Sequence, residues 1–406
     1  MNIKIHTMYY LPEFGSSSIL MNELAAYLSL KGYCVEIITT MPREASDNKY
    51  RGRVFSLEHT PAFDIKRFWV SSISGPLGRL IAWTIYGIFS AGNVLFTARR
   101  DIFFLRLPPL QLGVSGILAK RLKGSKLIIN VQDIHPDLAI ESGILKSKFL
   151  IKMAYFFERW VYSYADLIIV ISEGFKSNLL RKGVSVDKIR VIPNWVNAEF
   201  IKPLPKDNYL SEKLSLKSKF VIMYAGTISI SSIMSLNSFL DAAALLKEYG
   251  DILFVIVGEG LKRNSLEKKA KKMKLNNVLF TNFLPYEDIP FLFACADLLL
   301  VPIDIKKSEL SVPSKLYNCM ASARPVLCLA PNNSEIFNFV KDSGCGVSIE
   351  PGDAIKIRDI ILELRGLPDY CRKMGEDGRN YVLNNFSKDK VLKVYEDTLK
   401  EVVECN

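Results

Sequence analysis

Short apolar runs alternate with longer amphipathic stretches along most of this chain. A short apolar run bounded by turn residues is typical of a buried strand, whereas apolar positions spaced three and four residues apart predict a helix. In the first half, this pattern predicts strands at residues 3–7, 35–39, 102–105, 126–131, 167–171 and 191–192. In the second half, it predicts strands at residues 220–225, 253–257, 278–280, 298–301, 326–329 and 346–349. Strands that alternate with helices favour an α/β architecture with largely parallel sheets.

A polar stretch interrupts this alternation near the middle of the chain. Residues 201–218 hold two prolines and lack a strong apolar period, which is typical of a linker. The total of 406 residues is also enough for two domains with separate cores. We therefore expect two Rossmann-like domains, residues 1–200 and 201–384, with a cleft between them as the ligand site.

Charge and cysteine content narrow the class of partner and the compartment. A formal net charge of +11 implies an anionic partner, namely nucleotide phosphates, nucleic acid or an acidic membrane surface. No basic and aromatic module recurs, so we do not expect nucleic acid. The seven scattered cysteines predict reduced thiols in the cytoplasm, and the N-terminus has no signal-peptide pattern. No metal is expected, because no acidic or Cys/His spacing fits a metal site.

Two apolar stretches leave the role of the membrane open. Residues 80–98 carry no charge and are bracketed by Arg79 and Arg99, so they are a membrane span or a helix of the domain, with or without contact to a membrane. Residues 146–164 combine four cations with seven aromatic side chains. They are either an interfacial helix on an anionic membrane or an amphipathic core helix with a solvated basic face.

The most informative segment is residues 296–330, which predicts a strand, a polar loop, a helix and a strand. The helix opens inside Pro313-Ser314-Lys315, where unpaired N–H groups and the helix dipole favour an anion. Lys315 in the first turn opposes the dipole, which is tolerable if an anion binds beside it. We therefore predict a diphosphate cradle at Ser314, Lys315 and Leu316, with Asn318 one turn further on.

Small residues after two other strands predict close backbone approach to the same ligand. Gly15 and Ser16 follow the first strand, and Gly226 and Thr227 follow the strand that opens the second half. Arg263 is a second candidate cation, although a solvated surface arginine fits the sequence equally well.

Six stretches carry a family resemblance that covers nearly the whole chain. They are ADLIIVISEGFKSNLLRKGV (165–184), KIRVIPNWVNAEFIKPL (188–204), VIMYAGT (221–227), FVIVGEGLKRNSLE (254–267), NNVLFTNFLPYEDIPFLFACADLLLVP (276–302) and PSKLYNCMASARPVL (313–327). The chain resembles family 4 glycosyltransferases, which are retaining enzymes of the two-Rossmann GT-B architecture. The residues of these stretches are similar to those of the branch that builds bacterial surface polysaccharides, which includes amino-deoxysugar transferases of O-antigen and capsule pathways. The resemblance implies no cofactor, and a C-terminal helix, residues 385–406, that crosses back to the first domain and allows hinge closure near residue 200.

Three positions depart from the family pattern. Many members carry two glutamates separated by seven residues, whereas here the later position is Asn318 and the earlier is Leu310, with Glu309 one place early. Many also place an arginine and a lysine after the strand that opens the second domain, where this chain has TISISS at residues 227–232. This shifts the expected phosphate clamp onto Lys315 and backbone amides. Finally, Gln132 and Asp133 stand where relatives often have His-Asp.

The expected catalytic residues are His135, Asp133 and Glu309. His135 follows a buried strand in a loop of the predicted cleft, whereas His6 lies inside a strand and is expected in the core. Asp133 and Asp137 are alternatives to His135 for orienting the acceptor or acting as a base. The family's usual account is front-face departure, in which the leaving phosphate helps to take the acceptor proton, so no dedicated base is required.

The resemblance implies a hexosyl- or N-acetylaminodeoxyhexosyl-transferase that uses a nucleotide sugar, expected to be UDP-linked. The implied acceptor is a lipid-linked oligosaccharide, which places the enzyme in the cytoplasm on the inner face of the plasma membrane. Two other functions stay open at this point. One is a sugar-nucleotide 2-epimerase with the same architecture, and the other is a non-catalytic nucleotide-binding subunit.

Overall fold

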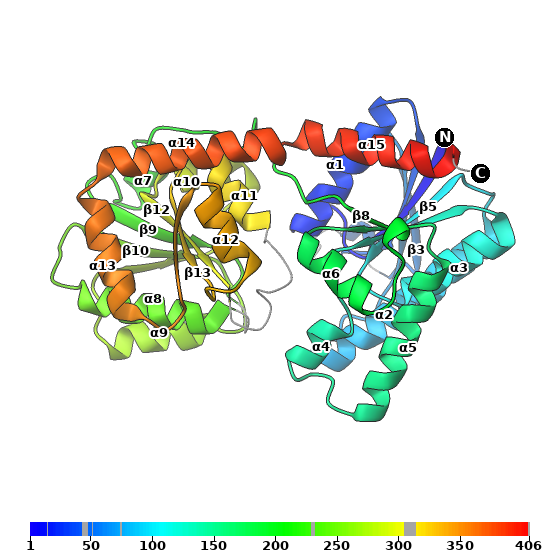
Figure 1. The fold of residues 1–406 in the computed structure, drawn as a ribbon, viewed down its shortest axis with the longest axis horizontal. Coiled ribbons are helices and arrows are strands. Elements are labelled where there is room, and N and C mark those ends of the chain that lie inside the picture. Colours follow the sequence, from blue (N-terminus) through cyan, green and yellow to red (C-terminus); the bar gives the residue numbers. More distant parts are fainter. Residues whose placement is uncertain are drawn as a thin grey trace. The chain divides into compact units, whose positions relative to one another are not determined.

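The computed structural model describes residues 1–13, 15–42, 48–50, 52–73, 75–228, 232–303 and 314–404. The chain divides into two compact units. Unit 1 comprises Met1–Asn194 and Val391–Asn406, and unit 2 comprises Trp195–Lys390. In each unit, helices cover a central sheet (Figure 1). The predicted α/β architecture of two Rossmann-like domains with parallel sheets is confirmed.

The sheet of unit 1 has eight strands in the order β3-β4-β2-β1-β5-β6-β7-β8. Their bounds are β1 Asn2–His6, β2 Cys34–Thr40, β3 Phe55–His59, β4 Asp64–Phe68, β5 Ile102–Leu107, β6 Lys126–Val131, β7 Leu167–Val170 and β8 Ile189–Val191. All neighbouring strands pair in parallel except β3 and β4, which form an antiparallel hairpin at the edge. The sequence pattern missed this hairpin because charged residues interrupt both of its strands.

Seven helices complete unit 1 within the described residues. They are α1 Ser16–Leu30, α2 Gly75–Phe96, α3 Leu112–Lys123, α4 Asp137–Glu141, α5 Lys148–Tyr164, α6 Glu173–Arg181 and α15 Lys388–Glu404. Helix α15 comes from the far end of the chain, yet it binds unit 1 through specific polar contacts. Asn130 donates to the Tyr395 hydroxyl at 3.0 Å, and the Glu396 carboxylate accepts from Tyr27 and Tyr33, each at 3.0 Å.

Helix α2 turns a polar stripe toward the sheet. The stripe follows helical spacing and consists of Tyr86, Ser90 and Asn93, and Thr97 continues it directly after the helix. The Lys4 ammonium of β1 donates to Asn93 Oδ1 at 3.2 Å and to Thr97 Oγ1 at 2.9 Å. The His6 Nδ1 lies 2.5 Å from Ser90 Oγ, and burial holds the pKa of His6 well below its usual value. His6 is fully buried, which confirms its predicted place in the core.

The opposite stripe of α2 is apolar and exposed. Leu77, Leu80, Ile88 and Leu95 are between 50% and 70% exposed. Among the described residues, Leu77–Phe96 is the one helical stretch long and apolar enough to cross a membrane by length and composition. Its polar contacts with β1, however, pack it onto the sheet as a helix of the domain. The inner face of α2 therefore mixes polar side chains with buried apolar ones such as Ala82 and Val94, whereas its exposed stripe is apolar, unlike that of an ordinary surface helix.

Unit 2 contains a wholly parallel six-stranded sheet in the order β11-β10-β9-β12-β13-β14. The strands are β9 Phe220–Ala225, β10 Ile252–Val257, β11 Val278–Thr281, β12 Leu298–Pro302, β13 Val326–Leu329 and β14 Gly346–Ile349. The helices are α7 Tyr209–Lys213, α8 Ile233–Leu245, α9 Arg263–Lys272, α10 Ile289–Ala294, α11 Ser314–Ala321, α12 Glu335–Asp342, α13 Ala354–Arg365 and α14 Pro368–Asn385. Alternate residues of β9 enter two separate core clusters, so both faces of this strand are buried.

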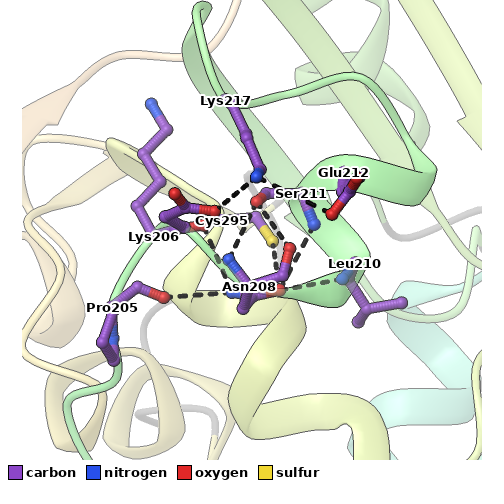
Figure 2. A network of polar contacts seen from close by, with 9 residues as sticks. Pro205, Lys206, Asn208, Leu210, Ser211, Glu212, Lys217 and Cys295 are labelled. Carbon is purple, nitrogen blue, oxygen red and sulfur yellow. Dashed lines mark hydrogen bonds and ion pairs between the residues drawn. The ribbon is translucent and has the colours of Figure 1, made fainter.

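The stretch predicted as a linker is an ordered part of unit 2 (Figure 2). Asn208 caps α7 by accepting from the backbone N–H of Leu210 and Ser211, and its amide donates to Phe291 O at 3.2 Å. Lys206 pairs with Asp297. The linker interpretation was wrong because the buried leucines here are too sparse to set a period, and because several polar side chains serve as caps and ion-pair partners.

Candidate functional site

Three residues of unit 2 meet at the carboxyl end of β9. The Lys315 Nζ atom of α11 lies 4.3 Å from the centroid of the Tyr224 ring. A Cβ atom built on Gly226 would lie only 2.1 Å from the same Nζ. Gly226 directly follows β9 and donates to Val257 O at 2.9 Å. The structure thus brings the predicted lysine and the predicted glycine together, and adds a tyrosine that sequence reasoning missed.

The charge of Lys315 has no counterion among the described residues. Burial lowers the pKa of Lys315 to about 8, against a small opposing effect from Cys319. A buried cation without an acidic partner is destabilising, and the face of an aromatic ring compensates only in part. A lysine with a strongly perturbed pKa at a strand end is a candidate for binding an anion.

Glycine residues, whose backbone carries no side chain, follow β9 and β10 near Lys315. A Cβ atom on Gly258 would lie 2.1 Å from Gly226 O, and one on Gly260 would lie 2.4 Å from Ile228 O. Both glycines also have positive φ angles, +142° and +145°. The segments after β9 and β10 therefore approach each other at a distance that only glycine permits. The exposed Thr227 contributes its carbonyl, which accepts from the Tyr224 hydroxyl at 2.7 Å.

Arg263 is engaged with the protein. Its Nη1 donates to Gly258 O at 2.5 Å and to Thr281 O at 2.9 Å, and its Nε donates to Glu267 at 2.8 Å. These bonds join the ends of β10 and β11. A role for Arg263 in holding a donor stays a prediction.

The other predicted residues of the cradle lie along α11. Ser314 and Lys315 form its first turn, whereas the Leu316 side chain is fully buried in the core, so only its backbone is available to a ligand. Asn318 is half-buried, and its side chain has no hydrogen-bond partner among the described residues. Glu309 lies outside the described residues.

In unit 1, the start of α1 is open for a ligand. Gly15 occupies the N-cap position, no side chain caps the helix, and no acidic residue lies in its first turn. A Cβ atom on Gly15 would meet no atom within 4 Å, so there is space in front of Ser16. Such a terminus favours an anion.

Arg106 is a residue of this region that sequence reasoning missed. It is the second-to-last residue of β5 and is 7% exposed, and its Nη1 donates to Ser17 Oγ in the first turn of α1. Burial lowers the pKa of Arg106 to about 10, while the negative charge of Asp133 opposes this shift. A charged residue inside the apolar run IFFLRL was the only available signal for it. Arg106 thus connects Asp133 electrostatically with the start of α1.

The three candidates after β6 have different surroundings. Asp133 is exposed, and His135 is half-buried with its ring edge-on to Trp83 at 5.3 Å between centroids. Asp137 is instead buried, accepts from Asn178 at 2.8 Å, and pairs with Lys182 at 2.9 Å. Asp137 therefore has a structural role, and Asp133 and His135 remain the candidates in this loop.

Three amide side chains, Asn130, Gln132 and Asn194, are linked by hydrogen bonds into an amide line next to the same loop. Gln132 donates to Asn130 at 2.8 Å, and Asn194 donates to Gln132 at 2.9 Å. Asn130 is itself bound to Tyr395 of α15. Because these side chains are buried or half-buried, their hydrogen bonds fix the backbone on which Asp133 lies. Among the described residues, no group of three or more His, Cys, Asp or Glu side chains is arranged to hold a metal ion.

Comparison with known families identifies both halves of the chain. Residues 18–195 match the family described as Glycosyl transferase 4-like domain, and residues 207–381 match the family described as Glycosyl transferases group 1. The fold is similar to sucrose-phosphate synthase from Thermosynechococcus elongatus, with a TM-score of 0.76 and 16% identity over 100% of both chains. It is also similar to Anabaena HepE in complex with UDP and glucose, with a TM-score of 0.73 and 17% identity, covering 99% of this chain and 100% of the other. The fold is therefore GT-B.

With its two matched domains, the chain is a glycosyltransferase of the GT-B type. Among curated proteins, it is 25% identical to the putative colanic acid biosynthesis glycosyl transferase WcaI of Escherichia coli K12, over 97% of this chain and 98% of the relative. It is 24% identical to the probable glycosyltransferase WbjE of Pseudomonas aeruginosa, over 74% of each. The predicted fold and enzyme class are confirmed.

Proposed function

We propose that this chain is a retaining glycosyltransferase that moves a hexose or an N-acetylated amino-deoxyhexose from a UDP-linked donor to a lipid-carried oligosaccharide. Relatives named for colanic acid biosynthesis and for O-antigen chain mannosyl transfer support a role in bacterial surface polysaccharide synthesis. Similar structures that contain UDP or UDP-glucose support the choice of donor base.

The observation that carries this proposal is the half-buried Lys315, whose ammonium lies beside Gly226 and over the Tyr224 ring. In glycosyl transfer, negative charge builds on the leaving diphosphate, and preorganised cations and N–H groups stabilise it most. The resemblance implies an arginine and a lysine directly after the strand that opens the second domain, and this chain has neither there. Lys315 supplies a positive charge at the end of that strand from α11 instead. The first N–H groups of α11 and the backbone at Gly226 and Thr227 complete the cradle.

The roles proposed for the other predicted residues follow from their positions in the two units. Asn318 binds the ribose or the base, since its amide lies one turn beyond Ser314. The start of α1 at Gly15 and Ser16 contacts the donor from unit 1. Asp133 and His135 orient the acceptor hydroxyl, and Glu309 contacts the donor sugar. The acceptor hydroxyl loses its proton to the departing diphosphate as the new glycosidic bond forms on the same face.

The enzyme acts in the cytoplasm, on the inner face of the plasma membrane. Helices α2 and α5 each expose an apolar stripe on unit 1, and α5 adds lysines that suit anionic lipids. A lipid-linked acceptor requires such a surface, and it accounts for part of the positive net charge. Nucleic acid is not a partner in this proposal.

A thermal-shift titration with UDP, GDP, TDP and CMP tests the donor site. It compares the unchanged protein with Lys315→Ala, Asn318→Ala and a control, Lys268→Ala, which alters an exposed lysine of α9. Stabilisation by UDP alone, lost in the first two variants and kept in the control, supports the proposal. Stabilisation by another nucleotide overturns the proposed donor base, and stabilisation by none overturns the proposed donor site. Conversion of the UDP-sugar without any acceptor indicates an epimerase.

A further inference from the structure

A second concave site lies in unit 1, between α5 and α6, away from the residues assigned above. Its volume is about 500 Å³, within the range of small-molecule sites. Its polar lining is mainly cationic and consists of Lys148, Lys152, Arg159, Arg181 and Lys182, together with Tyr155 and the acidic Glu158.

The positive charge of this pocket is largely uncompensated. Lys182 pairs with Glu158 at 2.8 Å and with Asp137 at 2.9 Å, so the acidic groups beside the pocket are already engaged. The other four cations have no ion pair or hydrogen bond among the described residues. Three of them come from α5, whereas Arg181 comes from the end of α6, so two elements converge on one anion-sized volume. Guanidinium groups match the geometry of phosphate oxygens.

The neighbouring face of α5 indicates where that phosphate comes from. Lys148 and Lys152 are four residues apart and share one side of the helix with Arg159. Each lysine is followed by an apolar residue, Phe149 or Met153, which lies on the adjacent side. Phe149 is 70% exposed, Met153 53% and Phe156 67%. A bilayer that receives these side chains brings its headgroup phosphates to the level of the lysines.

We propose that the α5–α6 pocket binds the phosphate group of an anionic glycerophospholipid headgroup, with Lys152 and Arg181 as its main ligands. The inference rests on the proposed function, because it names the lipid class of the surface on which the transferase acts. It differs from general attraction to a charged surface, since it assigns the phosphate to one pocket and predicts that cations outside the pocket matter less.

The test compares two charge-reversed variants of the full chain. Lys152→Glu/Arg181→Glu removes two pocket cations, and Arg79→Glu/Lys146→Glu removes two exposed cations near the apolar stripes that do not line the pocket. Binding to vesicles of phosphatidylcholine with and without phosphatidylglycerol is measured by flotation. Soluble dihexanoyl-phosphatidylglycerol, dihexanoyl-phosphatidylcholine and inorganic phosphate are titrated as monomers. The thermal shift with UDP reports in every variant whether unit 2 is intact.

We expect the pocket variant to lose on the order of tenfold or more of its affinity for anionic vesicles, and the control variant clearly less. Dihexanoyl-phosphatidylglycerol should bind the unchanged protein and not the pocket variant. Equal losses in both variants overturn the pocket, because they indicate diffuse surface charge. Binding of inorganic phosphate as tight as that of the lipid overturns the lipid assignment. In either case the thermal shift with UDP is measured separately, so neither outcome bears on the proposed donor site.

Discussion

The Lys315 ammonium lies 4.3 Å from the centre of the Tyr224 ring, at the end of β9, with no carboxylate to neutralise it among the described residues. Tyr224 belongs to the strand that opens unit 2, and Lys315 belongs to a helix three strands later in the chain. Their contact holds a positive charge in a largely desolvated position before any ligand arrives. This arrangement lowers the stability of the free protein and favours the binding of an anion. Mutation of Lys315 should therefore have opposite effects on stability and on binding.

Replacing Lys315 by alanine should weaken UDP binding and leave the unliganded protein as stable as before, or more so. The lost charge-assisted hydrogen bonds are worth about 2–3 kcal/mol, roughly a 30- to 150-fold rise in Kd. The free energy of unfolding should stay the same or rise because the mutation removes a desolvated cation. Calorimetric titration and urea unfolding measure the two effects, with Lys268→Ala as control. A variant that is destabilised but binds UDP normally would show that the lysine is structural.

UDP affinity should also fall as the pH rises through about 8, the lowered pKa of Lys315. Above that value the free protein carries a neutral amine, so binding must take up a proton. In the unfolded chain the same lysine titrates at about 10.5, so its contribution to the stability of the free protein increases between these two pH values. Lys315→Ala should give a weaker and flatter affinity profile, and a similar slope in both proteins would exclude Lys315 as the cause.

Gly226→Ala should displace the Lys315 ammonium. A methyl group at residue 226 would lie 2.1 Å from the lysine Nζ, and the lysine, as the flexible partner, must move. We expect UDP affinity to fall by about tenfold or more with moderate loss of stability from the strained backbone. Gly250→Ala is the matched control, because a methyl group there meets no atom within 4 Å. Equal UDP affinity in the two variants would contradict the predicted position of the ammonium.

Tyr395→Phe should loosen the loop that carries Asp133. The change removes the hydroxyl that accepts from Asn130, the first member of the amide line to Gln132 and Asn194. Loss of one buried hydrogen bond should lower the free energy of unfolding by about 1 kcal/mol. Transferase activity should fall while UDP affinity stays constant. Tyr381→Phe, in an aromatic cluster of unit 2, serves as control. Unchanged activity in Tyr395→Phe would mean that the amide line does not position the loop.

The exposed apolar stripe and the buried polar stripe of α2 predict that substitutions at Ile88 and Asn93 have the opposite of the usual effects on stability. Ile88→Gln on the exposed stripe should leave stability unchanged and weaken vesicle binding. Asn93→Leu on the inner stripe should destabilise by about 1–3 kcal/mol, because the Lys4 ammonium loses an acceptor. Chemical unfolding and flotation distinguish the two. If Ile88→Gln destabilises as strongly as Asn93→Leu, the exposed stripe is covered by protein.

The strands were the easiest elements to predict from the sequence, since parallel strands buried on both faces are nearly continuous apolar runs. The β3–β4 hairpin escaped because each of its strands carries charges, among them Glu58 and Arg67, which bind each other at 3.0 Å. Sequence reasoning could not find Arg106 or Tyr224, because their roles depend on neighbours from distant segments. Lys315 was predictable because a cation in the first turn of a helix conflicts locally with the dipole.

The contacts of α15 also determine the order in which the molecule can be completed. Tyr395 and Glu396 bind side chains of β6, of α1 and of the turn before β2, so unit 1 needs residues from both ends of the chain. A ribosome releases these last residues only after all of unit 2 has been made. Unit 1, whose synthesis begins first, is therefore completed last. A chain truncated before α15 would retain unit 2 up to Ser387 but leave unit 1 without its closing helix.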